Sequence, residues 1–312
     1  MLGQVKPENI GEYLSKIDRI FPSFCEKATD SVLEIEAYYD QSFWGYAIFH
    51  SWSGAIHMAL SKNGKFTKND YFAQAEEIAD LIRSEKSRGR NILRVLEVGS
   101  GRGFNLNFLS QEFKEIEFFG VDISSKNVRY AKRLNQDNSN CDVEIGDFHD
   151  LTKFDPEYFD LVFGVETICH ALTLEAVLAS ITHVIRKDGL FAVFDGFRNN
   201  FGGLGSLLQK AVVYTERSMA VPKFHETSVF IAETGSLGLT LVESVDRSDD
   251  AMPNLIRLSD LAKAFFKVPA IAKLIAKLLP DGLVKNAVAG LLMSVTVHTR
   301  AHRYLKMTLR KA

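Results

Sequence analysis

The sequence predicts a doubly wound α/β domain, because short apolar runs alternate with helical segments from about residue 90 onward. The first of these runs ends in a glycine-rich turn, as a strand does where it passes into a covering helix. With 312 residues and 46% hydrophobic content, the chain can also bury a full-sized core. We therefore expect a mainly parallel sheet with helices on both faces.

An aromatic-rich region, residues 1–89, precedes the sheet and is expected to be helical, since no strand alternation occurs in it. Seven aromatic residues crowd into its centre. They are Tyr38, Tyr39, Phe43, Trp44, Tyr46, Phe49 and Trp52. Taken by themselves, aromatic residues on a helix belong to a core more commonly than to a binding pocket.

The strands are expected at short runs that follow one another at intervals long enough to hold helices. The runs are RVLEVGSG, FFGVDIS, a run ending at IGDFHDL, DLVFGVE and LFAVFDGF. The segment SSKNVRYAKRLNQ opens with a serine cap signal, and TLEAVLASITHVIRKDG runs from a threonine to a glycine. Both are expected to be helices between strands.

The second half of the domain 90–312 is expected to carry two cap insertions, at about 197–225 and 250–300, and two further strands, LTLVESVDRS and RYLKMTLRK. Both insertions are too long and too apolar for simple connections, which predicts a mobile lid over a lipophilic acceptor. The residues on which this depends are Phe201, Leu204, Leu207, Leu208, Phe265, Phe266 and Leu274. Lysines repeat at i,i+4 in 258–282, which we interpret as an amphipathic lid helix with a kink near Pro269 in preference to a membrane-surface helix, although peripheral membrane contact stays open.

Charge and cysteine content exclude several classes of protein. A net charge of -2 gives no field for a nucleic-acid partner. Cys25, Cys141 and Cys169 are too widely spaced for a disulfide framework or a zinc site, which favours a cytoplasmic location. The N-terminus does not resemble a secretory signal, no transmembrane segment is expected, and the oligomeric state is not indicated. His149, although close to two aspartates, is expected to be solvated, so no metal is expected.

The glycine turn LEVGSGRGFN is the strongest chemical signal, with Glu97, Gly99, Gly101 and Gly103 where a strand becomes a helix. Glycine lets the backbone adopt positive φ and lets a ligand approach it closely. A dinucleotide fingerprint would place its third glycine at position 104, where this chain has Phe104. The pattern E-x-G-x-G-x-G instead resembles motif I of the class I methyltransferases, which bind S-adenosyl-L-methionine on a Rossmann-like sheet.

Acidic residues at later strand ends support a nucleoside ligand. Asp122 closes the next strand, where a carboxylate can accept hydrogen bonds from ribose hydroxyls. The resemblance implies that Asp147 and Phe148 contact the adenine, and it places Glu166 and His170 at the acceptor-facing motif. The resulting cofactor-binding set is Glu97, Gly99, Gly101, Gly103, Asp122, Ile123, Asp147, Phe148 and Val165, with Glu166 and His170 as catalytic candidates.

The segment GVETICHA resembles the sterol side-chain methyltransferases and relatives that methylate terpenoid or other lipophilic carbons. It implies methyl transfer to a small lipophilic acceptor in small-molecule biosynthesis, at carbon, oxygen or nitrogen. The alternatives are an NAD-dependent or nucleotide-sugar oxidoreductase and a non-catalytic cofactor-binding module. Purely structural roles are also open for both catalytic candidates: Glu166 could cap the following helix, and His170 could be a packing histidine.

Overall fold

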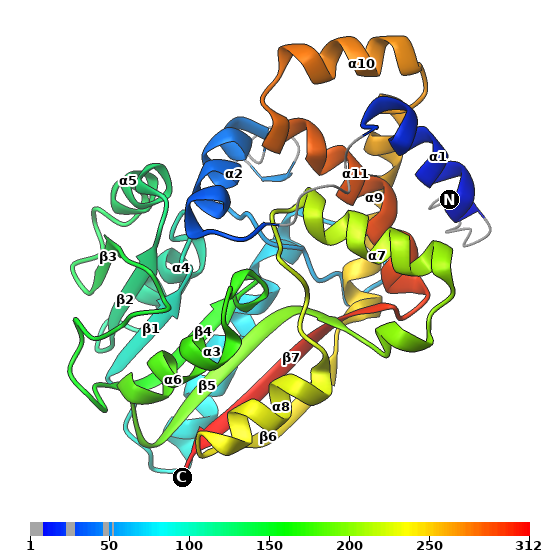
Figure 1. The fold of residues 1–312 in the computed structure, drawn as a ribbon. Coiled ribbons are helices and arrows are strands. Elements are labelled where there is room, and N and C mark those ends of the chain that lie inside the picture. The colour runs from blue at the N-terminus through cyan, green and yellow to red at the C-terminus, as the bar shows by residue number, and fades with distance from the viewer. Residues whose placement is uncertain (1–8, 23–28, 46–49, 52) are drawn as a thin grey trace.

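The structure is a computed structural model, which describes residues 9–22, 29–45, 50–51 and 53–312. Its centre is a seven-stranded sheet with strand order β3-β2-β1-β4-β5-β7-β6 (Figure 1). The strands are β1 (Arg94–Val98), β2 (Glu117–Asp122), β3 (Cys141–Ile145), β4 (Phe159–Val165), β5 (Ile185–Arg198), β6 (Leu239–Asp246) and β7 (His302–Lys311). The first five pair in parallel, and β7 runs antiparallel to β5 and β6. The predicted α/β fold is confirmed, with a strand at every predicted run.

Helices cover both faces of this sheet. On one face lie α3 (Ala73–Ser87), α4 (Phe104–Glu112) and α5 (Ser125–Leu134), whose apolar side chains share a core with β1 and β2. On the other face α6 (Leu174–Val184) and α8 (Thr227–Ser236) pack against β4, β5 and β7. Since α3 belongs to this core, the region before residue 90 contributes directly to the sheet's packing.

A group of cap helices gathers at one end of the sheet (Figure 1). It consists of α1 (Ile10–Ile20), α7 (Ser206–Ser218), α9 (Ser248–Phe265), α10 (Pro269–Leu278) and α11 (Asp281–His298), which share a third apolar core. The remaining elements are α2 (Val32–Gly45) and three short 3-10 helices, η3 (Lys68–Phe72), η4 (Ile168–His170) and η5 (Phe201–Gly203). Four of the seven predicted aromatic helix residues, Tyr38, Tyr39, Phe43 and Trp44, lie on α2, whereas Tyr46, Phe49 and Trp52 fall outside the described residues.

Two predicted helix boundaries are wrong. The helix expected to run to Gly189 ends at Val184, because Ile185 already pairs with Phe159 as the first residue of β5. The expected kink near Pro269 is a full break: α9 ends at Phe265, and Pro269 opens α10, where the missing N–H is not needed.

Candidate active site

A cavity of about 630 Å³ lies at the carboxyl ends of β1, β2, β3 and β4 and beside Asp195 and Gly196 of β5, beneath the cap helices. Seven of the predicted cofactor residues line it: Glu97, Gly99, Gly101, Asp122, Ile123, Phe148 and Val165. Both catalytic candidates, Glu166 and His170, line it as well. The sequence motifs thus converge on one space although they lie on four different strand ends.

The glycine turn has left-handed backbone at three alternate positions, with φ of 61° at Gly99, 53° at Gly101 and 70° at Gly103. A Cβ on Gly99 would collide with the Thr167 side chain, and one on Gly101 would lie 2.7 Å from Cδ1 of Ile56. Gly103 does not line the cavity but precedes α4 as its N-cap. The turn therefore brings bare backbone to the cavity at Gly99 and Gly101.

Asp122 holds this turn in place. Its Oδ2 accepts the Gly101 N–H at 2.8 Å, and its Oδ1 accepts the Ser124 N–H at 2.9 Å. Burial raises the pKa of Asp122 above its ordinary value, although these N–H donors oppose the shift. Because each carboxylate oxygen can accept two hydrogen bonds, Asp122 keeps acceptor capacity for a ligand hydroxyl.

Glu97 is a buried carboxyl group in which one of the two oxygens has no hydrogen-bond partner among the described residues. Its Oε1 accepts from Asn105 Nδ2 at 2.7 Å, whereas Oε2 is buried and has no partner among the described residues. Burial, reinforced by the negative charge of Asp122, raises the pKa of Glu97 to about 8. An unpartnered acidic group at a cavity wall favours a ligand that brings a donor and a positive charge.

The third strand end is arranged differently from the other two. Phe148 lines the cavity, and its ring stacks on His149 with centroids 4.9 Å apart. Asp147 does not line the cavity: its Oδ1 receives the His149 backbone N–H at 2.9 Å and lies 2.6 Å from His149 Nδ1. His149 is thus paired with Asp147, and no group of three or more His, Cys, Asp or Glu that could hold a metal occurs in the described part of the chain.

Glu166 lies in the left-handed region with φ of 52°, held there by its N–H, which donates to the Phe194 carbonyl at 2.7 Å. Its Oε1 accepts from the Met58 N–H at 2.6 Å and from the Tyr304 hydroxyl at 2.9 Å. Burial, with Asp195 nearby, raises the pKa of Glu166 to about 8. Glu166 does not cap η4, whose N-cap residue is Thr167.

His170 is buried, and its two ring nitrogens have different partners. Nδ1 lies 3.1 Å from the Ala220 carbonyl, and Nε2 lies 2.8 Å from the Tyr39 hydroxyl. A carbonyl only accepts, so Nδ1 carries the hydrogen, and Nε2 accepts from Tyr39 in the neutral ring. Burial lowers the pKa of His170 to about 4, which keeps the ring neutral at physiological pH.

One functional contact and one functional residue were not predicted from the sequence. Tyr39 belongs to the aromatic group noted in the sequence, but it lies 131 residues from its partner His170, a contact that no local pattern reveals. Asp195 lies near the end of β5, in the run VFDGF, and accepts the N–H groups of Thr167 at 3.1 Å and Cys169 at 3.0 Å. Burial raises the pKa of Asp195 to about 6. The signal that identified Asp122, an acidic residue at a strand end, was present for Asp195 too.

The outer wall of the cavity is mainly apolar and comes from the cap. It includes Leu258, Leu261, Phe265, Leu279, Leu283, Val284, Ala287 and Met293. The earlier insertion contributes Met219, Val221 and Phe224, which follow α7. The residues chosen from the sequence for this wall were wrong with the exception of Phe265: Leu207 and Leu274 are exposed, and Phe266 and Leu208 belong to the cap core. The helix periodicity did not show which face turns inward.

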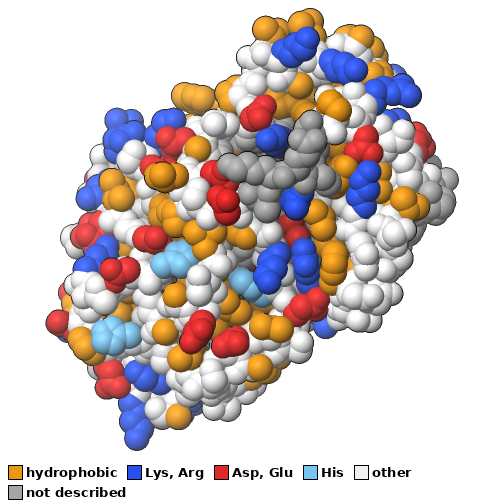
Figure 2. Space-filling model, viewed as in Figure 1, with side chains coloured by type: hydrophobic (Ala, Val, Ile, Leu, Met, Phe, Trp, Pro, Cys, Tyr) orange, Lys and Arg blue, Asp and Glu red, His pale blue; other side chains and the backbone are white. Residues whose placement is uncertain are grey.

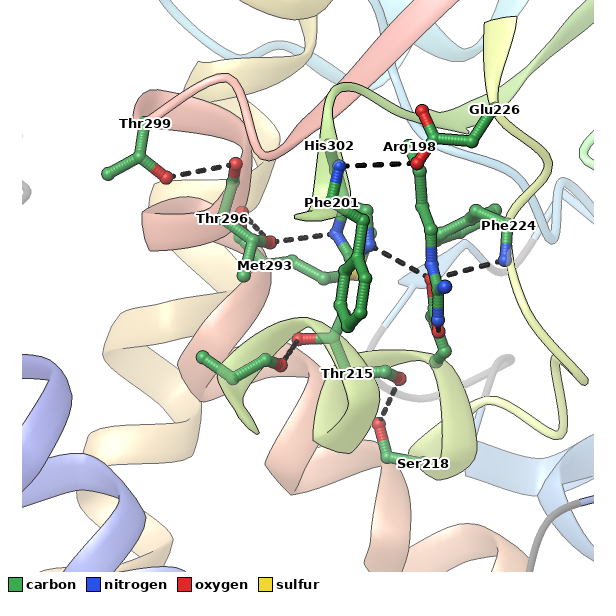
Figure 3. Close-up of polar contacts among 12 residues, drawn as sticks. Arg198, Phe201, Thr215, Ser218, Phe224, Glu226, Met293, Thr296, Thr299 and His302 are labelled. Atoms are coloured by element: carbon green, nitrogen blue, oxygen red, sulfur yellow. Dashed lines mark hydrogen bonds and ion pairs between the residues drawn. The ribbon is translucent and has the colours of Figure 1, made fainter. Parts of the chain in front are cut away.

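A buried ion-pair network fixes the segment that carries Phe224 (Figure 3). Glu216 accepts from Arg198 Nε at 2.7 Å and Nη2 at 2.5 Å, and from the Phe224 N–H at 3.1 Å. His302 Nε2 lies 3.3 Å from the same carboxylate, and His302 Nδ1 lies 3.0 Å from the Thr296 hydroxyl. The network therefore ties α7, β5, β7 and α11 together behind the cavity.

Residues 96–193 match the protein family described as "Methyltransferase domain". These residues include the glycine turn and all the strand ends described above except the final part of β5. The chain carries a methyltransferase domain. The resemblance to class I methyltransferases is confirmed.

Curated relatives of this methyltransferase domain include sterol enzymes. The chain is 24% identical over 205 residues to a sterol 24-C-methyltransferase of Candida albicans, covering 64% of this chain and 52% of that protein. It is 27% identical over 147 residues to 24-methylenesterol C-methyltransferase 3 of Arabidopsis thaliana, covering 46% and 39%. The chain thus matches about half the length, or less, of these relatives.

Solved structures share the fold of the methyltransferase domain and its cap. Mycolic acid cyclopropane synthase CmaA1, complexed with SAH and CTAB, superposes with a TM-score of 0.72 at 14% identity, covering 89% of this chain and 98% of that one. Geranyl diphosphate C-methyltransferase of Streptomyces coelicolor superposes with a TM-score of 0.61 at 13% identity, covering 95% and 98%. Among the described residues, no helix is long and apolar enough to cross a membrane.

Proposed function

We propose that this chain transfers a methyl group from S-adenosyl-L-methionine to a small lipophilic acceptor, in the manner of terpenoid- or sterol-like C-methylation. The observation that carries the proposal is the single cavity in which the glycine turn of β1 meets an apolar wall from α9 and α11. The sterol 24-C-methyltransferase relatives and the geranyl diphosphate C-methyltransferase neighbour support an acceptor of this kind. The widely spaced cysteines support a cytoplasmic location, and the acceptors of these relatives support a role in small-molecule biosynthesis.

The inner half of the cavity fits a cationic cofactor. Glu97 and Glu166 are buried acidic groups whose pKa is raised to about 8, and no ion pair with Lys or Arg is formed by either among the described residues. A bound cation would favour their ionised forms. We assign Glu97, Asp122 and the backbone at Gly99 and Gly101 to holding S-adenosylmethionine, with Ile123, Phe148 and Val165 packing against it. Asp147 and Gly103 would act indirectly, through His149 and the start of α4.

Positioning supplies most of the catalysis in this proposal. S-Adenosylmethionine, when bound, supplies an electrophilic methyl carbon. Displacement at that carbon requires the attacking atom to lie in line behind it in a site from which water is excluded. The apolar residues of α9 and α11 orient a lipophilic acceptor and exclude water, while Glu166 in its ionised form stabilises positive charge that develops on the acceptor.

Proton removal is assigned to Glu166 and to the pair formed by Tyr39 and His170. An alkene that gains a methyl group becomes a carbocation and must lose a proton to regain a double bond. Because His170 Nε2 faces the Tyr39 hydroxyl, His170 receives a proton from the acceptor only through Tyr39, which passes its own proton to Nε2 as it accepts one. Tyr39 is therefore expected to matter as much as His170.

Turnover of radiolabelled S-adenosylmethionine on a panel of sterols, terpenoids and polar acceptors tests the proposal. Glu166→Gln, His170→Ala and Tyr39→Phe should each leave S-adenosylhomocysteine affinity within a few-fold and lower kcat, because they face the acceptor. Tyr158→Phe, whose ring lies under Arg94 away from the cavity, is the matched control and should keep full turnover. Normal turnover in all three site variants would remove their assigned roles, and absence of turnover on any acceptor would contradict the enzymatic proposal.

The cap insertions at about 197–225 and 250–300 are proposed to order when ligands bind. Support comes from Met219, Val221 and Phe224 in the first and from the α9 and α11 residues in the second, all of which line the cavity. Hydrogen exchange with and without S-adenosylhomocysteine should show added protection in both segments. Equal, high protection in the free protein would show that they are fixed core.

A further inference from the structure

Little of the surface of helix α10 is buried against the rest of the molecule. It joins α9 to α11 at the outer edge of the cap, and Ala272 is its one buried residue (Figure 1). The apolar side chains Ile271, Leu274 and Leu278 are 56%, 57% and 73% exposed. Ile275 of α10 lines the cavity, but Leu274, which the sequence analysis placed in the lid over the acceptor, faces outward.

These side chains form a continuous stripe. Positions 271, 274 and 278 are spaced at i, i+3 and i+7, so they share one face of the helix. Lys273 and Lys277 are spaced at i,i+4 and form a neighbouring stripe, also exposed. Figure 2 shows hydrophobic and Lys or Arg side chains gathered over this end of the molecule.

The charged side chains of α10 itself are all positive. The helix contains two lysines and no acidic residue, in a chain whose net charge is -2, and Asp260 and Asp281 lie beyond its two ends. Lys263 pairs with Asp260, but Lys267, Lys273 and Lys277 form no ion pair among the described residues. Lysines without an ion-pair partner beside exposed apolar side chains complement a lipid bilayer, whose interior is apolar and whose headgroup layer is negatively charged when it contains anionic lipids.

We propose that α10 docks on the surface of a membrane that contains anionic lipids, with Ile271, Leu274 and Leu278 among the acyl chains and Lys273 and Lys277 at the phosphate groups. A second copy of the chain is a poorer occupant. A symmetric contact through the patch formed by the apolar and lysine stripes of α10 would bring the lysine stripes of both copies together, and like charges repel. A lipid surface offers acyl chains to the apolar stripe and phosphate groups to the lysine stripe at the same time.

The α10 stripes lie next to residues that line the cavity, so docking would place the cavity near the membrane; this step rests on the proposed function. Leu261 and Leu279 line the cavity and are also 44% and 45% exposed, and they flank α10 on either side. A lipophilic acceptor dissolved in the membrane could thus pass from the docking surface to the cavity along apolar side chains.

Co-sedimentation of the full chain with vesicles tests the docking without any turnover. The chain should bind vesicles of phosphatidylcholine with phosphatidylglycerol more tightly than phosphatidylcholine alone, and added salt should weaken binding. Ile271→Ser/Leu274→Ser/Leu278→Ser should weaken it at least about tenfold, since each serine removes apolar contact with the acyl chains. Lys273→Gln/Lys277→Gln should weaken it about 30-fold on the anionic vesicles.

Matched controls use exposed residues elsewhere on the molecule. Ile145→Ser/Val229→Ser/Val242→Ser removes three other exposed apolar side chains, and Lys114→Gln/Lys132→Gln removes two other exposed lysines. Both should bind like the unmodified chain. All variants should bind S-adenosylhomocysteine normally, which separates failure of docking from failure of the cofactor proposal.

Three results would overturn the docking proposal. One is absence of vesicle binding, and another is equal loss in the patch and control variants. The third is sedimentation velocity showing a dimer that the α10 variants dissociate, which would assign the patch to a second copy of the chain.

Discussion

Glu97 and Glu216 are both buried carboxyl groups, 2% and 1% exposed, yet their surroundings are opposite. Glu216 receives two hydrogen bonds from Arg198 and lies beside His302. Although burial opposes ionisation, these partners hold the pKa of Glu216 below its ordinary value. Glu97 has an asparagine as its one hydrogen-bond partner among the described residues, and its pKa is raised to about 8.

This difference in partners distinguishes a carboxylate that stabilises the fold from one that can bind a ligand. Glu216 has its cation within the chain, so it joins secondary-structure elements and offers nothing to a ligand. Glu97, and Glu166 on the neighbouring strand end, face the cavity and form no ion pair among the described residues; Arg102, which also lines the cavity, instead places its guanidinium over the Phe43 ring. A positively charged ligand would complete them, which is the physical basis for assigning S-adenosylmethionine here.

The largest expected effect comes from breaking the structural pair. Arg198→Met should lower the free energy of unfolding by about 3–5 kcal/mol, because it leaves Glu216 buried with a weaker partner. The double variant Arg198→Met/Glu216→Gln should recover most of this loss, since no uncompensated charge remains. Chemical denaturation of the two variants checks the pair, and equal destabilisation in both would mean that the ion pair is not what stabilises this region.

The cavity carboxyl groups should make stability fall as pH rises from 7 to 8. A raised carboxyl pKa means that the folded state binds more protons than the unfolded state from pH 4.5 up to about 8, so the slope is negative. It approaches about 1.4 kcal/mol per pH unit for each of Glu97 and Glu166. His170, whose pKa burial lowers to about 4, changes stability only below its ordinary pKa of 6.5.

The measurement is urea denaturation of the unliganded chain at both pH values. Glu97→Gln/Glu166→Gln should flatten the dependence, since glutamine does not ionise. A wild-type slope of zero or above would contradict the raised pKa values.

The smallest effect is expected for the same two substitutions at pH 7. Glu97 and Glu166 are then mostly protonated, and glutamine Oε1 can keep the bonds from Asn105, Met58 and Tyr304. Each substitution should change the free energy of unfolding by less than about 1 kcal/mol. A loss comparable with that of Arg198→Met, measured in the same denaturation series, would place these carboxyl groups among the structural ones.

The two halves of the cavity also differ in how far the sequence predicts them. The glycine turn and Asp122 are local features at strand ends, so their spacing along the chain fixes their place in the fold. Tyr304 contacts Glu166 across 138 residues, and no periodicity encodes that contact. The cap was expected from its length and apolarity, but the inward faces of α9 and α11 depend on packing among five helices, which the sequence pattern does not determine.

Isothermal titration with S-adenosylmethionine at pH 7, repeated in two buffers of different ionisation enthalpy, tests the central claim most directly. The account predicts binding with net proton release, because a bound cation lowers the pKa of Glu97, and it predicts less release for Glu97→Gln. NAD should give no binding heat. Binding of NAD in place of S-adenosylmethionine, or S-adenosylmethionine binding with the same proton exchange in wild type and Glu97→Gln, would contradict it.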